Sequence, residues 1–224
     1  PHINNQAAHA LLNEGDREAA LRALRTENFK VIVDEAVRFA VPGPKRLLDV
    51  GSAHGWFLEA AADQFEVLGV EPDDTLARHS LSRGLPVRAG YFADALTADE
   101  TFDVIVFNDV IEHIPDVGAA LAACCERLNK GGLLILNLPS SRGFFYKMAV
   151  ALAKIGLRGP FERLWQLGLP SPHLHYFNHR NLTRLVGRSG FTPVHFFELP
   201  ALRIRGLMER LRFVGRVNRV TLYA

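Results

Sequence analysis

The sequence contains little cysteine and no long uninterrupted apolar segment. Its two cysteines, Cys124 and Cys125, are neighbours, so they supply neither a disulfide framework nor the ligand set of a tetrahedral metal site. Both are expected to be small buried helix residues, and a reducing, cytoplasmic setting fits this usage. The best apolar candidate, Phe144–Gly156, is short and carries Lys147 and Lys154, so we expect no transmembrane helix.

The first residues show no secretion signal, and charge is unevenly distributed along the chain. Pro1–Ala10 lack the basic-then-apolar pattern of such a signal. Residues 1–141 contain 12 Lys and Arg against 21 Asp and Glu, whereas residues 142–224 contain 14 against 3. The balances of −9 and +11 give the net charge of +2 and predict a change of role near residue 140.

Apolar runs and helical patterns alternate between residues 45 and 138. Short apolar runs predict buried strands at residues 46–50, 66–71, 86–89, 102–107 and 133–138. Helical patterns lie between them at residues 56–64, 73–83 and 117–128, the last closed by Gly131-Gly132. Because strands apolar on both faces belong in a parallel sheet covered by helices, we predict an α/β fold with a doubly wound sheet. Ligands are expected at the carboxyl ends of its strands.

The segments on either side of this alternation predict further elements. Helical patterns at residues 6–24 and 27–40 predict N-terminal helices within residues 1–41. After Pro139, residues 140–172 predict an insertion with two helices, and Asn178 is expected to cap a helix over residues 178–189. Two last strands are predicted at residues 191–198 and 217–223, separated by an Arg-rich helix around residues 203–212.

The most informative motif is Asp49-Val50-Gly51-Ser52-Ala53-His54-Gly55, which lies where the first strand turns into a helix. Small residues at positions 51, 53 and 55 allow the backbone to approach a ligand closely, and a helix N-terminus beyond them offers unpaired N–H groups. Glu71 ends the next strand, 20 positions after Gly51, where a carboxylate can accept hydrogen bonds from ribose hydroxyls. A dinucleotide fingerprint needs a small residue at the sixth position, counted from Gly51. That position is Trp56 here, so the spacing disfavours a dinucleotide cofactor such as NAD.

Asp49–Gly55 resembles motif I of the class I S-adenosylmethionine-dependent methyltransferases, D-x-G-x-G-x-G, with Ala53 in place of the middle glycine. The resemblance continues in order through Val67–Pro72, Gly90–Leu96, FDVIVFNDVIEHIP and LNKGGLLILNL. The run HLHYFNHRNLTRLVGRSGF is similar to the subgroup that contains the ubiquinone-biosynthesis O-methyltransferases. This resemblance implies a Rossmann-like methyltransferase sheet, mostly parallel with an antiparallel last strand. Residues 42–139 and 173–224 would form the cofactor domain, with residues 140–172 as a helical lid.

The resemblance also implies S-adenosylmethionine as the cofactor and a role for each residue of its site. The loop would hold the methionine end, Asp49 would act through a water or the amino group, and Asn108 would face the same moiety. Glu71 would hold the ribose, and Asp94 would meet the adenine. The implied cofactor-binding residues are Asp49, Gly51, Ser52, Ala53, His54, Gly55, Glu71, Pro72, Phe92, Asp94 and Asn108.

Two groups of polar residues are candidates for acceptor chemistry. His113 follows the fourth strand and is the leading candidate for a general base, with Glu112 beside it to orient it. In the alternative interpretation, which we weigh equally, Glu112 and His113 only begin a helix and are hydrogen-bonded to the backbone. His175, with His173 and Tyr176, lines the acceptor pocket as a second catalytic candidate in one interpretation. In the other, these are surface loop residues or a structural hydrogen-bond network. No His-x-x-x-His or Cys-pair pattern supports a metal ion, so no metal site is predicted.

The acceptor class follows only in outline. The predicted lid mixes aromatic and aliphatic residues with Lys and Arg, which suits a lipid-like, aromatic or anionic small molecule or peripheral contact with a membrane surface. A helical subdomain with solvated basic residues explains the same composition. The leading hypothesis is an enzyme that methylates an O, N or C atom of a small molecule. The alternative is an RNA- or protein-binding or -modifying module with the same cofactor fold, although the aromatic–basic pattern of an RNA module is absent.

Overall fold

The structure is a computed structural model that describes residues 22, 25–43, 45–166 and 171–200. The chain divides into two compact units: Glu35–Phe196 is one, and the residues before and after it belong to the other. Residues 25–39 are helical, as predicted for residues 27–40. In the smaller unit, the Asn28 side chain donates a hydrogen bond to the Pro200 carbonyl oxygen (3.3 Å). Most of the helix predicted at residues 6–24 lies outside the described residues.

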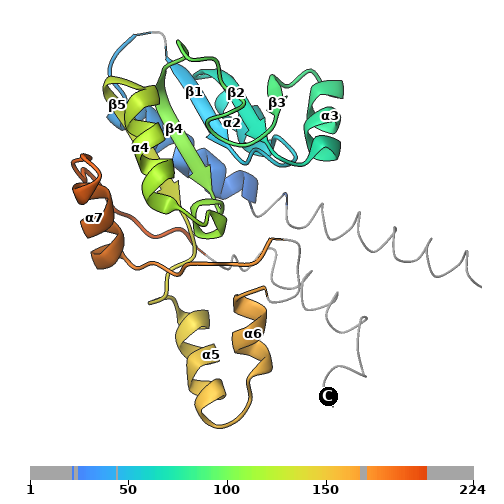
Figure 1. Ribbon diagram of the computed structural model, residues 1–224, viewed down its shortest axis with the longest axis vertical. Helices are drawn as coiled ribbons and strands as arrows, with labels where there is room; N and C mark the ends of the chain where they lie inside the picture. Colours follow the sequence, from blue (N-terminus) through green and yellow to red (C-terminus); the bar gives the residue numbers. More distant parts are fainter. Residues whose placement is uncertain (1–21, 23–24, 44, 167–170, 201–224) are drawn as a thin grey trace, which may run out of the picture. The chain divides into compact units, whose positions relative to one another are not determined.

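The larger unit is built on one sheet with strand order β3-β2-β1-β4-β5 (Figure 1). The strands are β1 (Arg46–Val50), β2 (Glu66–Glu71), β3 (Val87–Ala89), β4 (Phe102–Asn108) and β5 (Leu128–Asn137). All four strand pairings are parallel, which confirms the predicted α/β Rossmann-like sheet. The order reverses between β1 and β4, and ligands bind beside the carboxyl ends of strands at such a switch point.

The helices of this unit largely follow the sequence patterns. They are α2 (Trp56–Ala61), α3 (Asp74–Ser82), η1 (Ile111–His113), α4 (Val117–Arg127), α5 (Phe144–Lys154), α6 (Gly159–Leu164) and α7 (His179–Arg188). Asp73 caps α3, and Asn178 caps α7 in a reciprocal capping box with Asn181. No helix among the described residues is long and apolar enough to cross a membrane.

The core lies on both faces of the central strands. Leu47 and Leu48 of β1 and Ile105 of β4 are fully buried, because a central parallel strand is covered by helices on either side. Cys124 on α4 belongs to this core, as predicted. Cys125 does not: its side chain is exposed, and its thiol donates to the Ser189 carbonyl oxygen (3.2 Å).

The junction between α4 and β5 differs from the prediction. The helix ends at Arg127, Leu128 takes extended dihedral angles and β5 runs through Gly131-Gly132. Leu128 pairs with Phe102, and the register shifts before Val104 pairs with Leu133. The extra residues on β5 form an irregularity in which Gly131 adopts φ 76°, so the glycines lie within the strand region and do not end the helix.

The predicted antiparallel end of the sheet is not supported. Residues 191–198 form no strand, although they lie within the described chain. Pro193 lacks the backbone N–H that a strand ladder requires, which is one reason why this apolar run does not extend the sheet. The predicted strand at residues 217–223 and the helix at residues 203–212 lie outside the described residues. The described sheet is therefore entirely parallel.

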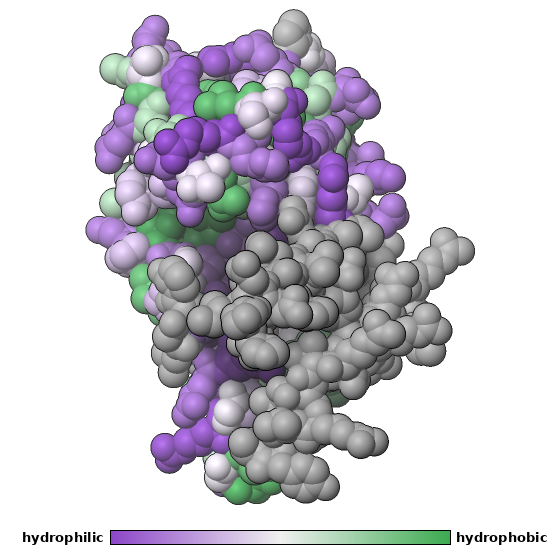
Figure 2. Space-filling view, turned by 90° about the vertical axis from the view of Figure 1, so that its right-hand side faces the viewer, coloured by the Kyte–Doolittle hydropathy of each residue, from purple (hydrophilic) through white to green (hydrophobic). Residues whose placement is uncertain are grey.

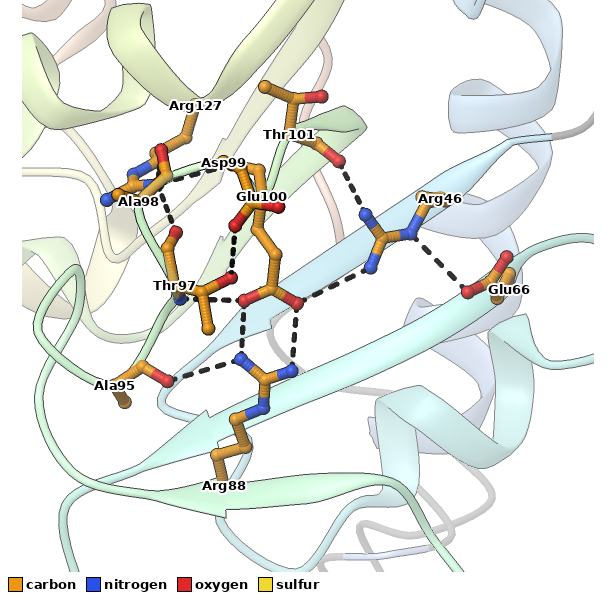
Figure 3. A network of polar contacts seen from close by, with 10 residues as sticks. All are labelled: Arg46, Glu66, Arg88, Ala95, Thr97, Ala98, Asp99, Glu100, Thr101 and Arg127. Carbon is orange, nitrogen blue, oxygen red and sulfur yellow. Dashed lines mark hydrogen bonds and ion pairs between the residues drawn. The ribbon is translucent and has the colours of Figure 1, made fainter.

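A cluster of arginines and acids fixes the loop between β3 and β4 (Figure 3). Glu100 accepts hydrogen bonds from the Arg88 guanidinium, with Nη2 to Oε1 at 2.8 Å, and from the Thr97 amide. The Arg88 hydrogen bond lowers the pKa of Glu100 to about 2. Arg127 donates to the Ala98 carbonyl oxygen (2.9 Å), and Arg46 donates to that of Thr101 (3.0 Å). Because Arg46 begins β1, this network lies at the end of the sheet opposite to the strand carboxyl ends.

Candidate cofactor and acceptor site

The loop between β1 and α2 requires small residues for two reasons. Gly51, Ala53 and Gly55 adopt φ values of 72°, 44° and 72°, a region that favours glycine. A Cβ atom on Gly51 would lie 2.6 Å from the Val110 Cγ2 atom, which is closer than packed carbon atoms approach. The Gly51 and Ser52 amides both donate to the Val70 carbonyl oxygen, at 2.8 and 3.1 Å. The loop is therefore held against the end of β2 and against Val110 in the segment after β4.

Glu71 lies at the carboxyl end of β2, with its side chain turned to this loop. It is 7% exposed, and its Oε2 atom accepts a hydrogen bond from the Ala53 amide (2.8 Å). Its Oε1 atom accepts one from the Asp73 amide (2.9 Å). A carboxylate has about four acceptor positions, so about two remain for hydroxyl donors of a ligand. The sequence placed Glu71 near the cofactor, but it did not reveal that this side chain also shapes the loop.

Three strand ends meet through polar side chains beside the loop. Asn108 of β4 donates to the Asp49 Oδ1 atom of β1 (3.3 Å), and Asn137 of β5 donates to the Asn108 Oδ1 atom (3.4 Å). Asp49 is 2% exposed. Burial raises its pKa to about 8, the Asn108 hydrogen bond opposes this rise, and the charge of Glu71 adds to it. Sequence reasoning missed Asn137, whose only signal was a polar residue at the end of an apolar strand.

This buried carboxyl group suits a ligand that carries positive charge. Without a nearby cation, Asp49 is held largely in its neutral form near pH 7 by burial. The methionine end of S-adenosylmethionine carries an ammonium and a sulfonium group, and either charge would favour the ionised carboxylate. The small-residue loop, Asp49 and Glu71 therefore fit this cofactor at three separate chemical features.

The other residues assigned to the cofactor lie around the same end of the sheet. The Gly90 amide donates to the Glu71 carbonyl oxygen (2.9 Å), which brings the loop after β3 next to β2. In that loop Phe92 packs edge-on against Phe107 (5.7 Å between ring centroids), while Asp94 is exposed. Pro72 is also exposed, and His54 stacks on Trp56 at 4.8 Å. The roles of these residues toward the adenosine moiety stay predictions.

His113 follows β4 in η1 and has one ring nitrogen committed. Its Nδ1 atom lies 2.9 Å from the Pro172 carbonyl oxygen, and a carbonyl only accepts, so Nδ1 carries the hydrogen. In the neutral ring, the Nε2 atom is then the nitrogen with the free lone pair, as a general base requires. The backbone link predicted as the alternative is also present, so one hydrogen bond serves both interpretations: it anchors the ring and sets its tautomer.

The segment of residues 172–176 is tied directly to η1. The Leu174 and His175 amides both donate to the Glu112 carbonyl oxygen, at 2.8 and 3.1 Å. The His175 Nε2 atom lies 3.1 Å from the Ile114 carbonyl oxygen and therefore donates to it. His175 thus takes part in a structural network, and its catalytic role stays a prediction.

The hydrogen bonds of His173 and Tyr176 form a chain with a defined direction. The Tyr176 hydroxyl donates to the Leu164 carbonyl oxygen (2.8 Å), so it accepts a hydrogen bond from the His173 Nδ1 atom (2.9 Å). The His173 Nε2 atom must then accept from the Gln166 amide (2.9 Å). The end of α6 is thereby joined to residues 173–176 and, through them, to η1.

Glu112 does not orient His113 through a hydrogen bond, as one interpretation predicted, because the Pro172 carbonyl oxygen holds the His113 ring instead. Its side chain is fully buried, and neither carboxylate oxygen has a hydrogen-bond partner. Burial raises its pKa to about 8. One potential ligand atom from each of Glu112, His113 and His173 lies within 4.8 Å of the others. The expectation of no metal at this site stays a prediction.

The parallel sheet and its strand order place the chain in the class of Rossmann-like folds. The sequence pattern of the family described as "Methyltransferase domain" matches residues 18–196. This match covers most of the chain, and the chain therefore belongs to this methyltransferase family. Its cofactor is S-adenosylmethionine, as the resemblance of the glycine loop to motif I implied.

Curated relatives agree with this assignment over part of their length. A ubiquinone biosynthesis O-methyltransferase from Paramagnetospirillum magneticum is 38% identical over 95 residues, which cover 40% of this chain and 38% of that protein. Another, from Caulobacter sp. (strain K31), is 36% identical over 121 residues, which cover 50% of this chain and 46% of that protein. In these two comparisons, the match spans less than half of either relative.

Solved structures of low sequence identity share the fold. A SAM-dependent methyltransferase from Thermotoga maritima, described as a "possible histamine N-methyltransferase", superposes with a TM-score of 0.58 at 22% identity. That match covers 81% of this chain and 78% of the other. The YcgJ protein from Bacillus subtilis gives a TM-score of 0.57 at 16% identity, over 84% of this chain and 83% of the other.

Proposed function

We propose that this protein transfers the methyl group of S-adenosylmethionine to a nucleophilic atom of a small-molecule acceptor. The observation that carries the proposal is the joint placement of the positive-φ loop, buried Asp49 and buried Glu71 at the switch point between β1 and β4. Bound there, the cofactor supplies an electrophilic methyl group together with its own leaving group. The protein contributes orientation, exclusion of water and, for an O–H or N–H acceptor, removal of a proton.

The acceptor is expected on the side of η1, because Val110 packs on Gly51 and is followed by Glu112 and His113. In the proposed reaction, the His113 Nε2 atom takes the acceptor proton, while the Nδ1–H bond to Pro172 holds the ring. The helices α5 and α6 are proposed as the lid over this site. Two links support the lid: the His173 amide donates to the Trp165 carbonyl oxygen (3.1 Å), and the Tyr176 hydroxyl donates to that of Leu164.

The test of this function starts with the cofactor and then addresses the base. Calorimetry should detect binding of S-adenosylhomocysteine and no binding of NAD. Labelled S-adenosylmethionine should then transfer its methyl group to a member of a panel of phenols, amines, sugars and lipids. Failure to bind S-adenosylhomocysteine would overturn the proposal.

His113→Ala should lower turnover by about 10²–10⁴-fold, as expected for loss of a general base. Its affinity for S-adenosylhomocysteine should stay within about twofold, because the ring is anchored on the Pro172 carbonyl oxygen and is assigned to the acceptor. His79→Ala, on the exposed face of α3, is the matched control. Unchanged turnover in the His113 variant would remove this residue as the base, and loss of turnover on treatment with a chelator would point to a metal ion instead.

A small-molecule acceptor is favoured over RNA or protein, because both curated relatives reported above are named for a small-molecule pathway.

We also propose contact with an anionic membrane surface through α5 and α6. Within residues 142–166, five basic residues face a single acid, Glu162. Phe144 and Ile155 are 73% and 72% exposed. In Figure 2, hydrophobic and hydrophilic surfaces lie side by side at the lower end, where the turn between these helices lies. The free thiols of Cys124 and Cys125 support a cytoplasmic location.

A further inference from the structure

Among the described residues, no side chain forms a hydrogen bond or salt bridge with the buried carboxyl group of Glu112. Its side chain is fully buried, and both of its oxygen atoms lack a hydrogen-bond partner. Buried acceptors are nearly always satisfied, so a group left unsatisfied in this way needs an explanation. No Lys or Arg among the described residues forms a salt bridge with it at 4.0 Å or less. The neighbouring His173 is kept neutral, since burial and the proximity of His113 lower its pKa.

A cluster of aromatic rings lies on α5, at α6 and on the segment of residues 172–176, whose amides bind the Glu112 carbonyl oxygen. The Tyr176 ring is the centre of the group, with Tyr146 at 4.8 Å and Trp165 at 4.9 Å between ring centroids. Phe161 contacts Tyr146 at 6.4 Å and Trp165 at 6.2 Å. Burial raises the pKa of the Tyr176 hydroxyl to about 12, and the charge of Glu112 adds to this rise. The Trp165 Nε1 atom is also buried without a hydrogen-bond partner.

A carboxylate beside aromatic faces is a site for an organic cation. The faces of Tyr and Trp attract an ammonium group through their quadrupoles, and a carboxylate accepts its N–H donors. We propose that Glu112, with the rings of Trp165 and Tyr176, holds a protonated amino group of the methyl acceptor. The proposal rests on the proposed function and names a substrate class for it: small molecules that carry an amine. This amine is a recognition group, while His113 removes the proton from the atom that is methylated.

A metal ion fits the same residues less well. Both ring nitrogens of His173 already take part in hydrogen bonds, Nδ1 with Tyr176 and Nε2 with Gln166. Among the three grouped residues, only the Glu112 carboxylate and the His113 Nε2 atom remain as donors. A zinc site requires about three or four protein ligands. An ammonium group needs no such set, and the aromatic rings give it contacts that a metal ion does not use.

The test compares two probes that differ by one charged group. Tyramine carries an ammonium group, and 4-ethylphenol has the same ring and chain without it. With S-adenosylhomocysteine bound, tyramine should bind the wild-type protein at least about tenfold more tightly than 4-ethylphenol, as expected for one charge-assisted contact. Glu112→Gln should remove this preference. Glu162→Gln, which changes an exposed acid on α6, is the matched control and should retain it.

A second measurement needs only the wild-type protein. Because burial keeps the pKa of Glu112 at about 8, its carboxyl group is mostly protonated at pH 7, and an ammonium group bound beside it should expel that proton. Calorimetry in buffers of different ionisation enthalpy should therefore show nearly one proton released for each tyramine and none for 4-ethylphenol. The groups that face Glu112 are Asp109, His113, His173 and Tyr176. His113→Ala should leave the release unchanged, which excludes that imidazole as the source.

The outcomes separate this inference from the function on which it rests. If S-adenosylhomocysteine does not bind, the proposed function fails. If it binds and the wild-type protein shows neither the tyramine preference nor the proton release, the amine subsite is overturned while the function stands. Binding of Zn²⁺ or Mg²⁺ that Glu112→Gln abolishes, without a tyramine preference, would assign the carboxylate to a metal and overturn the subsite equally.

Discussion

Substitution of Glu71 separates the two tasks that the structure gives to this carboxylate. It accepts one hydrogen bond from Ala53 in the cofactor loop and one from Asp73 at the start of α3. A hydrogen bond to a charged group contributes about 1.5–3 kcal/mol. Glu71→Gln retains one acceptor oxygen, so it should lower the free energy of unfolding by about the value of one bond. Glu71→Ala removes both and should cost about twice as much.

The same variants should weaken the cofactor. Glu71→Gln loses one charged acceptor for the ribose, about 1.5–3 kcal/mol, which corresponds to a rise in the Kd for S-adenosylhomocysteine of about 10–150-fold. Denaturant unfolding without ligand measures the first effect and calorimetry measures the second. Glu66→Gln, at the other end of β2, is the control, because its side chain is 75% exposed and its ion pair with Arg46 spans 3.4 Å. It should cost less than about 1 kcal/mol.

Two results would contradict the double role of Glu71. If Glu71→Gln loses stability as expected while its Kd stays within about twofold of wild type, Glu71 only shapes the loop and does not hold the ribose. If neither quantity changes, the hydrogen bonds to Ala53 and Asp73 do not matter to the folded protein. Only a loss in both quantities supports a carboxylate that serves the loop and the ligand together.

Three further predictions concern the loop, the buried acid and the lid. Gly51→Ala should lower the free energy of unfolding, measured with denaturant, by about 1–3 kcal/mol. Adding Val110→Ala should recover only part of this loss, because it removes the contact at 2.6 Å but not the φ of 72°; full recovery would show that φ is irrelevant. Burial raises the pKa of Asp49 to about 8, so the folded state binds more protons than the unfolded state between about pH 4 and 8, and ligand-free stability should fall as pH rises through that range. Asp49→Asn should reduce this dependence in unfolding curves at pH 5–9, and an unchanged slope would contradict it. Vesicles with anionic lipid should sediment the wild-type protein more than Phe144→Ser, with neutral vesicles as control; equal sedimentation would argue against membrane contact.

The sequence alone determined the features that depend on neighbouring residues. Strands such as Val104–Phe107 are apolar on both faces, and this identifies a parallel sheet without knowledge of its partners. The cap Asn178 was predictable because its side chain contacts the amides two and three residues later. The motif around Gly51 indicated the cofactor through its resemblance to motif I of the methyltransferases. Its small residues meet the positive φ values of the loop, which are a local property of the chain.

Only the tertiary structure decided the features that depend on distant residues. The surroundings of Glu112 depend on residues 172–176, which lie about 60 positions later in the chain and bind η1 through backbone hydrogen bonds. Asn137 joins the site because β5 pairs with β4, and its only local signal, a polar residue that ends an apolar strand, does not reveal its partner. Residues 191–198 have strand-like composition but form no strand, since a strand needs both free backbone donors and an available edge. The sequence gives the chemical type of each side chain. Its burial, its tautomer and its neighbours are decided only when segments that are distant in the sequence pack together.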